Sequence, residues 1–224
     1  MPFWVLQAPN TVSEEMSDSS QITALCDRAA RGDQAALGEL CEVHRESLVR
    51  IIQFRLDAKI RSRVDAGDVV QEAIIEAMAR FQDYLAQQED WPFFVWLRYI
   101  TLQKLAQFHR RHLKVKARDA SRDVSIFASP QFTATSVMLA NQLVKQQTSP
   151  SMAAARTEQR QRIQLALESM DGIDREVLAL RQFEHLGNSD VASVLQISQT
   201  AANNRYVRAL QRLKRIMDDV SDRA

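Results

Sequence analysis

Two segments of the chain combine basic side chains with a complete absence of acidic ones. Residues 91–118 hold seven Lys and Arg and residues 198–217 hold five, and neither segment contains an Asp or Glu. The formal charge of the chain is only +1, so the other 176 residues carry −11. A single basic run is compatible with a solvated helix face, although such faces usually mix both signs. Two acid-free segments favour a bipartite surface for phosphate groups.

The first basic segment is also rich in aromatic residues. Five of the fifteen aromatic residues of the chain lie within nine positions, namely Trp91, Phe93, Phe94, Trp96 and Tyr99. Large rings at helical spacing are commonly buried in a core. Flat rings beside Lys and Arg can instead hold the unstacked bases of single-stranded DNA. The sequence is compatible with both roles, some rings being buried and others exposed.

The second basic segment completes a pattern typical of a helix-turn-helix. A short helix over about 189–195 is followed by a turn at Gln196-Ile197, and Ser198 is placed to cap a helix over 198–217. A helix in the major groove reads base edges with short polar groups at its leading end, where Asn and Gln suit adenine and Arg suits guanine or phosphate. The leading residues are Gln199, Thr200, Asn203, Asn204, Arg205 and Arg208. An ordinary helical hairpin with a polar face is the alternative.

Catalytic and metal-binding chemistry finds little support in the sequence. His109 and His112 could share a helix face with a metal ion, but arginines flank them and no nearby acid or thiol completes a ligand set. The five glycines are scattered singly, which argues against phosphate loops and dinucleotide fingerprints. Cys26 and Cys41 are too few for a disulfide framework or a zinc ribbon and predict buried free thiols. We expect no enzyme activity, cofactor or metal.

The elements that position these residues are predicted to be helices. Apolar residues recur at three- and four-residue spacing along most of the chain, and no stretch shows the alternation of a strand. The pattern predicts an all-α fold of two helical domains joined by a linker. The expected boundaries are a disordered lead at 1–20 (with Met16 as an alternative start), a first domain at 21–118, a linker at 119–150 and a second domain at 151–224.

Capping residues give the expected ends of two helices. Asp65 is the expected N-cap of a helix with Asp68 in its first turn. Asp174 is the expected cap of a helix that runs to Leu186, and Gly187 is expected to end it.

No apolar run approaches the roughly 18 residues of a membrane span, and the N-terminus lacks the features of a signal peptide. We therefore expect no membrane insertion and a cytoplasmic location.

From about residue 21 to 216, the sequence resembles bacterial sigma factors of the extracytoplasmic-function (ECF) group. Asp65-Ala-Gly-Asp68-Val-Val-Gln71-Glu72 resembles the family's acidic D-x-x-D-hydrophobic-hydrophobic-Q-E motif. Trp96-Leu97-x-x-Ile100 matches its W-L-x-x-I signature, residues 174–181 resemble the helix before its helix-turn-helix, and residues 190–213 fit that motif without a gap. His109-Arg110-Arg111-His112-Leu113 with Arg118-Asp119 is similar to planctomycete members.

The resemblance implies a transcription initiation factor that binds core RNA polymerase and directs it to promoter DNA. The acidic helix would dock on the β′ clamp helices through Asp65, Asp68, Gln71 and Glu72. The first domain would melt and read the minus-ten element through Trp96, Arg98, Tyr99, Gln103, Lys104, Gln107, Arg110, Arg111 and His112. The second would read the minus-35 element through Ser198, Gln199, Thr200, Asn203, Asn204, Arg205, Arg208 and Arg212. An anti-sigma factor is a further partner that the resemblance implies, although no residue identifies it.

Several positions depart from the family pattern. One is Thr200-Ala201-Ala202, where the family's recognition helix often begins Gly-Thr-Val. Gln103 and Gln107 stand where the family often has Asn and Asp, which affects base preference at the melted element. Gln196 stands in the turn where Gly is common. The alternative function is a conventional helix-turn-helix regulator with a helical sensor or dimerisation domain that does not bind polymerase. That alternative accounts for the second basic segment but not for the aromatic, acid-free first one.

Overall fold

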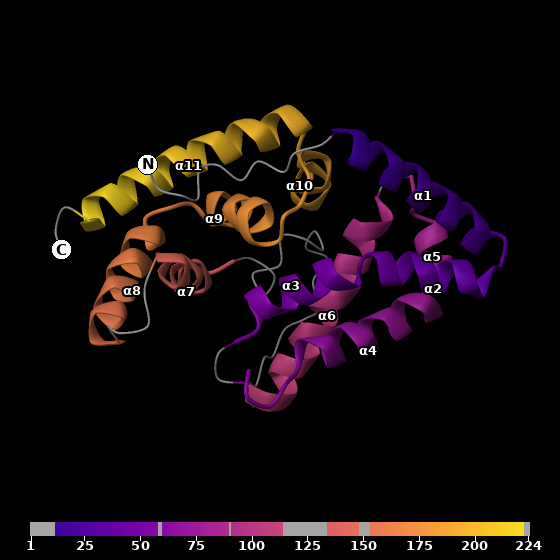
Figure 1. Ribbon diagram of the computed structural model, residues 1–224, viewed down its shortest axis with the longest axis horizontal. Coiled ribbons are helices and arrows are strands. Elements are labelled where there is room, and N and C mark those ends of the chain that lie inside the picture. Colours follow the sequence, from indigo (N-terminus) through magenta and orange to yellow (C-terminus); the bar gives the residue numbers. More distant parts are fainter. Residues whose placement is uncertain (1–11, 58–59, 90, 114–133, 148–152, 222–224) are drawn as a thin grey trace. The chain divides into compact units, whose positions relative to one another are not determined.

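The computed structural model describes residues 12–57, 60–89, 91–113, 134–147 and 153–221 (Figure 1). All regular elements within these ranges are helical, which confirms the predicted all-α fold. The chain divides into two compact units, Met1–His44 and Arg45–Ala224. The domain boundaries that the sequence predicts at 118 and 151 stay predictions.

The first unit is built on two helices that pack against each other. They are α1 (Val12–Ala30) and α2 (Gln34–Val43). Asp33 caps α2 by accepting a hydrogen bond from Ala36 N at 3.0 Å, and its carboxylate also pairs with Arg28 at 2.7 Å. The helix α1 begins inside the segment 1–20, for which the sequence predicts a disordered lead. A polar stretch without an apolar period can extend a helix whose later turns are packed, so periodicity alone places its start too late. Residues 1–11 lie outside the described ranges.

The second unit begins with the helix that carries most of the first basic segment, α6, and with the helices that precede it. They are α3 (Arg45–Arg55), α4 (Ala66–Ala79), α5 (Phe81–Leu85) and α6 (Phe93–Leu113). Helices α4 and α6 lie side by side, and α3 packs on both (Figure 1). The predicted cap at Asp65 is confirmed, since its carboxylate accepts from Gly67 N at 2.7 Å. A Cβ at position 67 would lie 2.9 Å from that carboxylate oxygen, so the glycine makes room for the cap.

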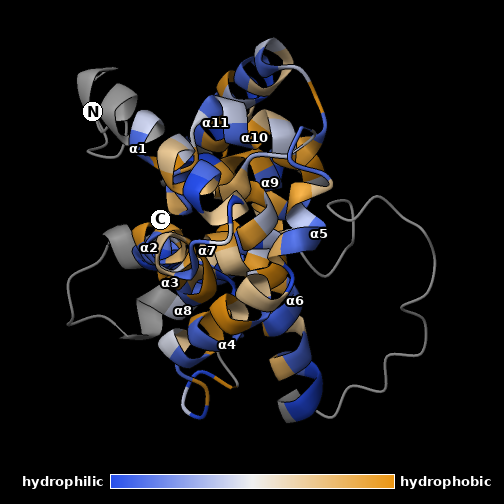
Figure 2. Ribbon diagram, turned by 90° about the vertical axis from the view of Figure 1, so that its right-hand side faces the viewer, coloured by the Kyte–Doolittle hydropathy of each residue, from blue (hydrophilic) through white to orange (hydrophobic). Residues whose placement is uncertain are grey.

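The rest of the second unit carries the helix-turn-helix. Its elements are α7 (Ser136–Gln147), α8 (Ala153–Glu168), α9 (Gly172–Leu178), the π-helical turn η3 (Ala179–Phe183), α10 (Asn188–Leu195) and α11 (Gln199–Ser221). Helix α7 lies within the predicted linker and packs along α8, and α11 packs on α8, α9 and α10. Most helices show both hydrophilic and hydrophobic residues along their length, as helices with one buried face do (Figure 2).

The predicted ends of the helix before the helix-turn-helix are wrong. Its N-cap is Asp171, and Asp174 lies in its first turn. The helix widens at its end into η3, where a hydrogen bond from Glu184 N to Ala179 O at 2.9 Å spans five residues. The left-handed residue that follows is His185, with φ of 57°. Gly187 has an extended backbone and is the N-cap of α10. The helical segment therefore ends at Phe183, three residues before the predicted end at Leu186.

Two buried apolar clusters connect the helices of this unit. The larger one joins Phe54 of α3 to residues of α7, α8, α9 and α11. The smaller one joins Val95 of α6 to Leu180 of η3 and to Val191 and Val194 of α10, with Trp91 and Phe94 packed against it. No helix of the described ranges is long and apolar enough to cross a membrane.

Candidate polymerase and nucleic-acid interfaces

The acidic motif lies on an exposed face of α4. Asp65, Asp68 and Gln71 are exposed and Glu72 is half-buried. Gln71 accepts a hydrogen bond from Arg45 Nη2 at 2.7 Å, which holds its amide in place. One further residue of this face escaped the sequence analysis, because it adjoins the apolar stripe. Ile75 lies one turn beyond Gln71, and 59% of its surface is exposed. The face therefore offers an apolar side chain next to acidic groups.

The side chains at the centre of α6 form a polar chain with α4. The Lys104 ammonium lies 2.6 Å from a carboxylate oxygen of Glu76. Arg80 donates to the same glutamate at 3.3 Å and to the Gln103 amide oxygen at 3.4 Å. Gln103 in turn donates to the Tyr99 hydroxyl. The structure thus brings together three of the predicted minus-ten residues and anchors them to α4.

The pKa values follow from these contacts. Hydrogen bonding to Lys104, aided by its charge and by Arg80, lowers the pKa of Glu76 despite some burial. Burial raises the pKa of Tyr99, and the charge of Arg80 opposes this only in part. Glu76 is therefore ionised and Tyr99 protonated at neutral pH. A protonated phenol beside a cation is able both to donate to a base edge and to stack.

A cavity of about 290 Å³ lies beside this polar chain. Its lining residues are Arg80, Asp83, Ala86, Gln87, Trp91, Trp96 and Tyr99. The rings of Trp91 and Tyr99 meet edge to face, with centroids 6.1 Å apart. A lining that combines aromatic rings with an arginine, an aspartate and an amide suits a flat, polar-edged ligand such as a nucleobase.

The aromatic residues divide between the buried core and the cavity. Phe93 and Trp96 are buried and pack with Tyr84, whose ring centroid lies 5.3 Å and 5.2 Å from theirs. Trp91 and Tyr99 are half-buried and line the cavity. Trp96 also lines the cavity, as a wall supported by the core.

The outer end of α6 carries the other predicted minus-ten residues. Gln107 is half-buried, and Arg110 and Arg111 are exposed, with the Arg111 guanidinium 5.7 Å from the centre of the Phe108 ring. His109 accepts a hydrogen bond from Asp57 N at 3.3 Å, and burial lowers its pKa. The side chain of His112 and residues 114–118 lie outside the described ranges. Among the described residues there is no group of three acids, thiols or histidines that could hold a metal ion.

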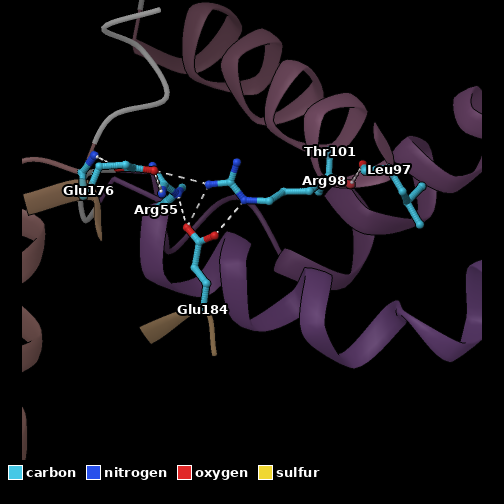
Figure 3. Close-up of polar contacts among 7 residues, drawn as sticks. Arg55, Leu97, Arg98, Thr101, Glu176 and Glu184 are labelled. Carbon is cyan, nitrogen blue, oxygen red and sulfur yellow. Dashed lines mark hydrogen bonds and ion pairs between the residues drawn. The ribbon is translucent and has the colours of Figure 1, made fainter. Parts of the chain in front are cut away.

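Arg98 occupies a different environment from the other predicted minus-ten residues. It is 1% exposed and does not line the cavity, and its guanidinium points toward Glu184, with Nε 2.8 Å from a carboxylate oxygen (Figure 3). Arg55 and Glu176 complete a buried cluster of four charges. Of the four, only Arg98 was predicted from the sequence to be a functional residue. The available signal was weak, since each of the four has an apolar residue directly beside it in the chain.

The helix-turn-helix presents the leading end of α11 to solvent. Ser198 caps the helix, as predicted, by accepting from Ala201 N at 3.2 Å. The Asn188 amide donates to Gln199 O at 2.9 Å and ties α10 to the start of α11. Most of the predicted minus-35 residues are exposed, namely Ser198, Gln199, Thr200, Asn203, Asn204 and Arg208.

Two basic residues of α11 instead donate hydrogen bonds to other parts of the second unit. Arg205 is half-buried and donates to Asp174 at 3.3 Å, and Arg212 donates to Ser169 O at 2.5 Å. They orient the helix on α9 and on the turn after α8. Of the three arginines predicted to contact the minus-35 element, Arg208 is the exposed one, and it lies one turn beyond Asn204.

Comparison with known proteins adds evidence independent of this geometry. Residues 160–213 match the family model described as sigma-70, region 4. The ECF RNA polymerase sigma factor SigD of Mycobacterium tuberculosis is 30% identical over 197 residues, which cover 87% of this chain and 82% of SigD. RNA polymerase sigma factor CnrH of Cupriavidus metallidurans is 26% identical over 207 residues, covering 92% of this chain and 98% of CnrH.

A solved structure of CnrH in complex with the cytosolic domain of CnrY is also similar, with a TM-score of 0.49 and 24% identity. The similarity covers 89% of this chain and 98% of that one. The identity and mutual coverage with SigD show that this chain belongs to the family of ECF RNA polymerase sigma factors.

Proposed function

We propose that this sigma factor binds core RNA polymerase through α4, captures melted minus-ten DNA with α6, and grips the minus-35 duplex with α11. The observation that carries the proposal is the placement of an aromatic cavity and an exposed recognition helix in one chain of this family. Such a protein selects promoters and leaves catalysis to the polymerase, so we infer no enzyme activity of its own and a cytoplasmic site of action.

The cavity beside α6 is proposed to hold one unstacked base of the minus-ten element. Because the Trp91 and Tyr99 rings are nearly perpendicular, one of them would stack on the base and the other would meet its edge. Gln87 and Arg80 would contact its polar edge. Stacking of a base on an aromatic ring contributes about 1–3 kcal/mol. Arg110 and Arg111, at the outer end of α6, would follow the phosphates of the same strand.

The exposed end of α11 is proposed to enter the major groove. Asn203 and Asn204 are suited to adenine edges, and Arg208 to guanine or phosphate. Thr200 and Gln199, at the very start of the helix, lie where a recognition helix contacts bases. Arg205 and Arg212 act on DNA only if they leave their present partners on α9 and the α8 turn.

The exposed face of α4 is proposed to bind the clamp helices of the polymerase β′ subunit. Asp68 and Glu72 supply charge, and Ile75 supplies an apolar contact that becomes buried. A buried apolar side chain surrounded by polar ones is the usual composition of an interface hot spot.

Two finer assignments rest on the sequence. The segment from His109 to Leu113 supports membership of a planctomycete-type subgroup. An anti-sigma protein is a proposed further partner. CnrH, a relative of this chain, has been solved with the cytosolic domain of CnrY.

The test is a core-binding and transcription assay with variants of each face. Ile75→Lys and Asp68→Lys should weaken core binding at least tenfold, with duplex binding unchanged. Arg208→Ala should reduce transcription from the matching promoter about tenfold, with core binding unchanged. Gln82→Lys on α5 and Gln211→Ala on α11 are exposed controls and should behave as wild type. Tight duplex binding without polymerase association would instead establish a conventional helix-turn-helix regulator.

A further inference from the structure

The four-charge cluster joins the helices proposed to act on the two promoter elements. Arg55 of α3 and Arg98 of α6 face Glu176 of α9 and Glu184, which follows η3 (Figure 3). Arg55 donates from Nε to Glu184 and from Nη2 to Glu176 at 2.6 Å. Arg98 donates to both oxygens of Glu184, at 2.8 Å and 3.3 Å. Two positive and two negative charges therefore neutralise each other.

The cluster is almost completely shielded from water. The exposed fractions of the four side chains are 3% for Arg55, 2% for Arg98, 9% for Glu176 and 0% for Glu184. The second oxygen of Glu176 accepts from Ala134 N at 2.6 Å, so the chain that enters α7 is held at the same point. Ion pairs buried to this extent gain little net stability over apolar packing, because both partners lose their hydration. Their advantage is that separated charges regain hydration, which makes such an interface reversible.

Apolar contacts around the cluster connect the same helices. The rings of Phe54 and Phe183 stack with centroids 5.2 Å apart and planes 6° from parallel. Val95 is buried against α10, and Trp91 and Phe94 of the proposed minus-ten surface pack on the same cluster. In this arrangement α6 and the helix-turn-helix are direct neighbours.

That neighbourhood is incompatible with occupying both promoter elements together. Elements centred about 25 base pairs apart are separated by roughly 85 Å along B-DNA, at 3.4 Å per base pair. Helix α6 has 21 residues and α11 has 23, so even end to end they would span only about 65 Å at 1.5 Å per residue. The two helices must therefore move apart before a promoter is engaged at both ends.

We propose that the Arg55–Arg98–Glu176–Glu184 cluster is a latch that holds the free sigma factor closed and opens when it binds polymerase and promoter. This inference rests on the proposed function. Opening also releases Arg98, which then becomes available to DNA phosphates as the sequence resemblance implies. Because only the open form engages polymerase and promoter, the apparent affinity is the affinity of the open form multiplied by the fraction of molecules that are open.

The experiment measures energy transfer between dyes in the full chain. Cysteines are placed at exposed Ser62, between α3 and α4, and at exposed Gln161 on α8, and Cys26 and Cys41 are replaced by Ala. For otherwise wild-type protein, transfer should be high in the free state and fall in the initiating polymerase–promoter complex. If transfer is unchanged in a complex that initiates, the latch is excluded while the proposed function stands. Failure to join polymerase or to initiate would count against the proposed function itself.

Variants of the cluster test its role directly. Arg55→Gln and Glu184→Gln remove opposite sides of one contact. Each should lower transfer in the free protein and tighten binding to core polymerase about three- to tenfold. The double variant should add little to either single one, because both break the same network. Glu158→Gln removes an exposed ion pair on α8 and is the matched control. Folded variants that keep the energy transfer of wild type would refute the latch. If the variants do not fold, the change in energy transfer of otherwise wild-type protein on joining the complex decides whether the latch exists.

Discussion

Burial sets the protonation of three histidines in the described chain. It lowers the pKa of His44 from 6.5 to about 4. It also lowers the pKa of His109, where the charge of Asp57 partly opposes it, and the pKa of His185, where the charge of Arg50 adds to it. Each imidazole is therefore neutral at pH 7. Acid must charge these groups more easily in the unfolded chain than in the folded one.

Replacement of His44 by Leu is expected to reduce the acid sensitivity of the protein. Between pH 6.5 and about 4 the unfolded chain binds the extra proton at this position, so stability falls as pH falls through that window. The loss attributable to His44 is about 2 kcal/mol at pH 5, at 1.36 kcal/mol per pKa unit. Urea denaturation of wild type and His44→Leu at pH 7 and pH 5 measures it. An equal change in both proteins would show that His44 is not the responsible group.

At the scale of elements, the turn of the helix-turn-helix contains a strained residue. Gln196 has φ of 54° and ψ of 44°, the left-handed conformation. Ile197 N donates to Ala192 O at 3.0 Å across this turn, which closes the end of α10. A residue with a Cβ pays about 1–2 kcal/mol in that conformation, and glycine does not. The family's preference for Gly at this position therefore has a local physical cause.

Gln196→Gly is expected to stabilise the protein by about 0.5–1 kcal/mol. The relief of strain exceeds the extra entropy that glycine gives the unfolded chain. Gln196→Ala is the matched control, since alanine keeps the Cβ and should bring no gain. Chemical denaturation of the three proteins measures the effect. Equal stabilisation by Ala and Gly would assign the gain to loss of the glutamine side chain and contradict the strain.

For the whole molecule, the near-zero net charge conceals charges in two kinds of environment. Positive side chains such as Arg110, Arg111 and Arg208 are exposed to water and to salt. Arg55 and Arg98 are buried against carboxylates. Burial by itself would lower the pKa of Arg55, but Glu176 and Glu184 outweigh it and raise that pKa. Burial would raise the pKa of Glu184, and the two arginines overcome it so that the pKa is lowered. Arg55 and Glu184 are therefore both ionised at neutral pH.

Salt concentration is therefore expected to weaken the interactions of the exposed charges much more than those of the buried cluster. Four phosphate contacts would lose about a hundredfold in duplex affinity between 50 and 200 mM salt, because bound counterions are released. The buried cluster is screened much less, so the dimensions of the free protein should not change over that range. Fluorescence anisotropy with duplex DNA and small-angle X-ray scattering of the free protein measure the two effects. Expansion of the free protein at 200 mM would show that exposed charges hold it closed.

Local patterns allowed the helices, the Asp65 and Ser198 caps and the exposed end of α11 to be predicted from sequence. Each depends on residues two to four positions apart. The cavity, the exposed Ile75 and the charge cluster depend on residues brought together from distant segments. Arg55 and Glu184 are 129 positions apart, and no periodicity relates them. The misplaced end at Gly187 has a different origin, since a π-helical turn leaves no simple signature in sequence.

The neutral cluster also constrains how this protein diverges. A change of Arg55, Arg98, Glu176 or Glu184 alone leaves a buried charge without its counterpart, which is far more costly than exchange of the whole set for apolar residues. Descendants of this chain should therefore keep the four residues together or lose them together. The four residues should therefore change as one unit, although they lie on three separate segments of the chain.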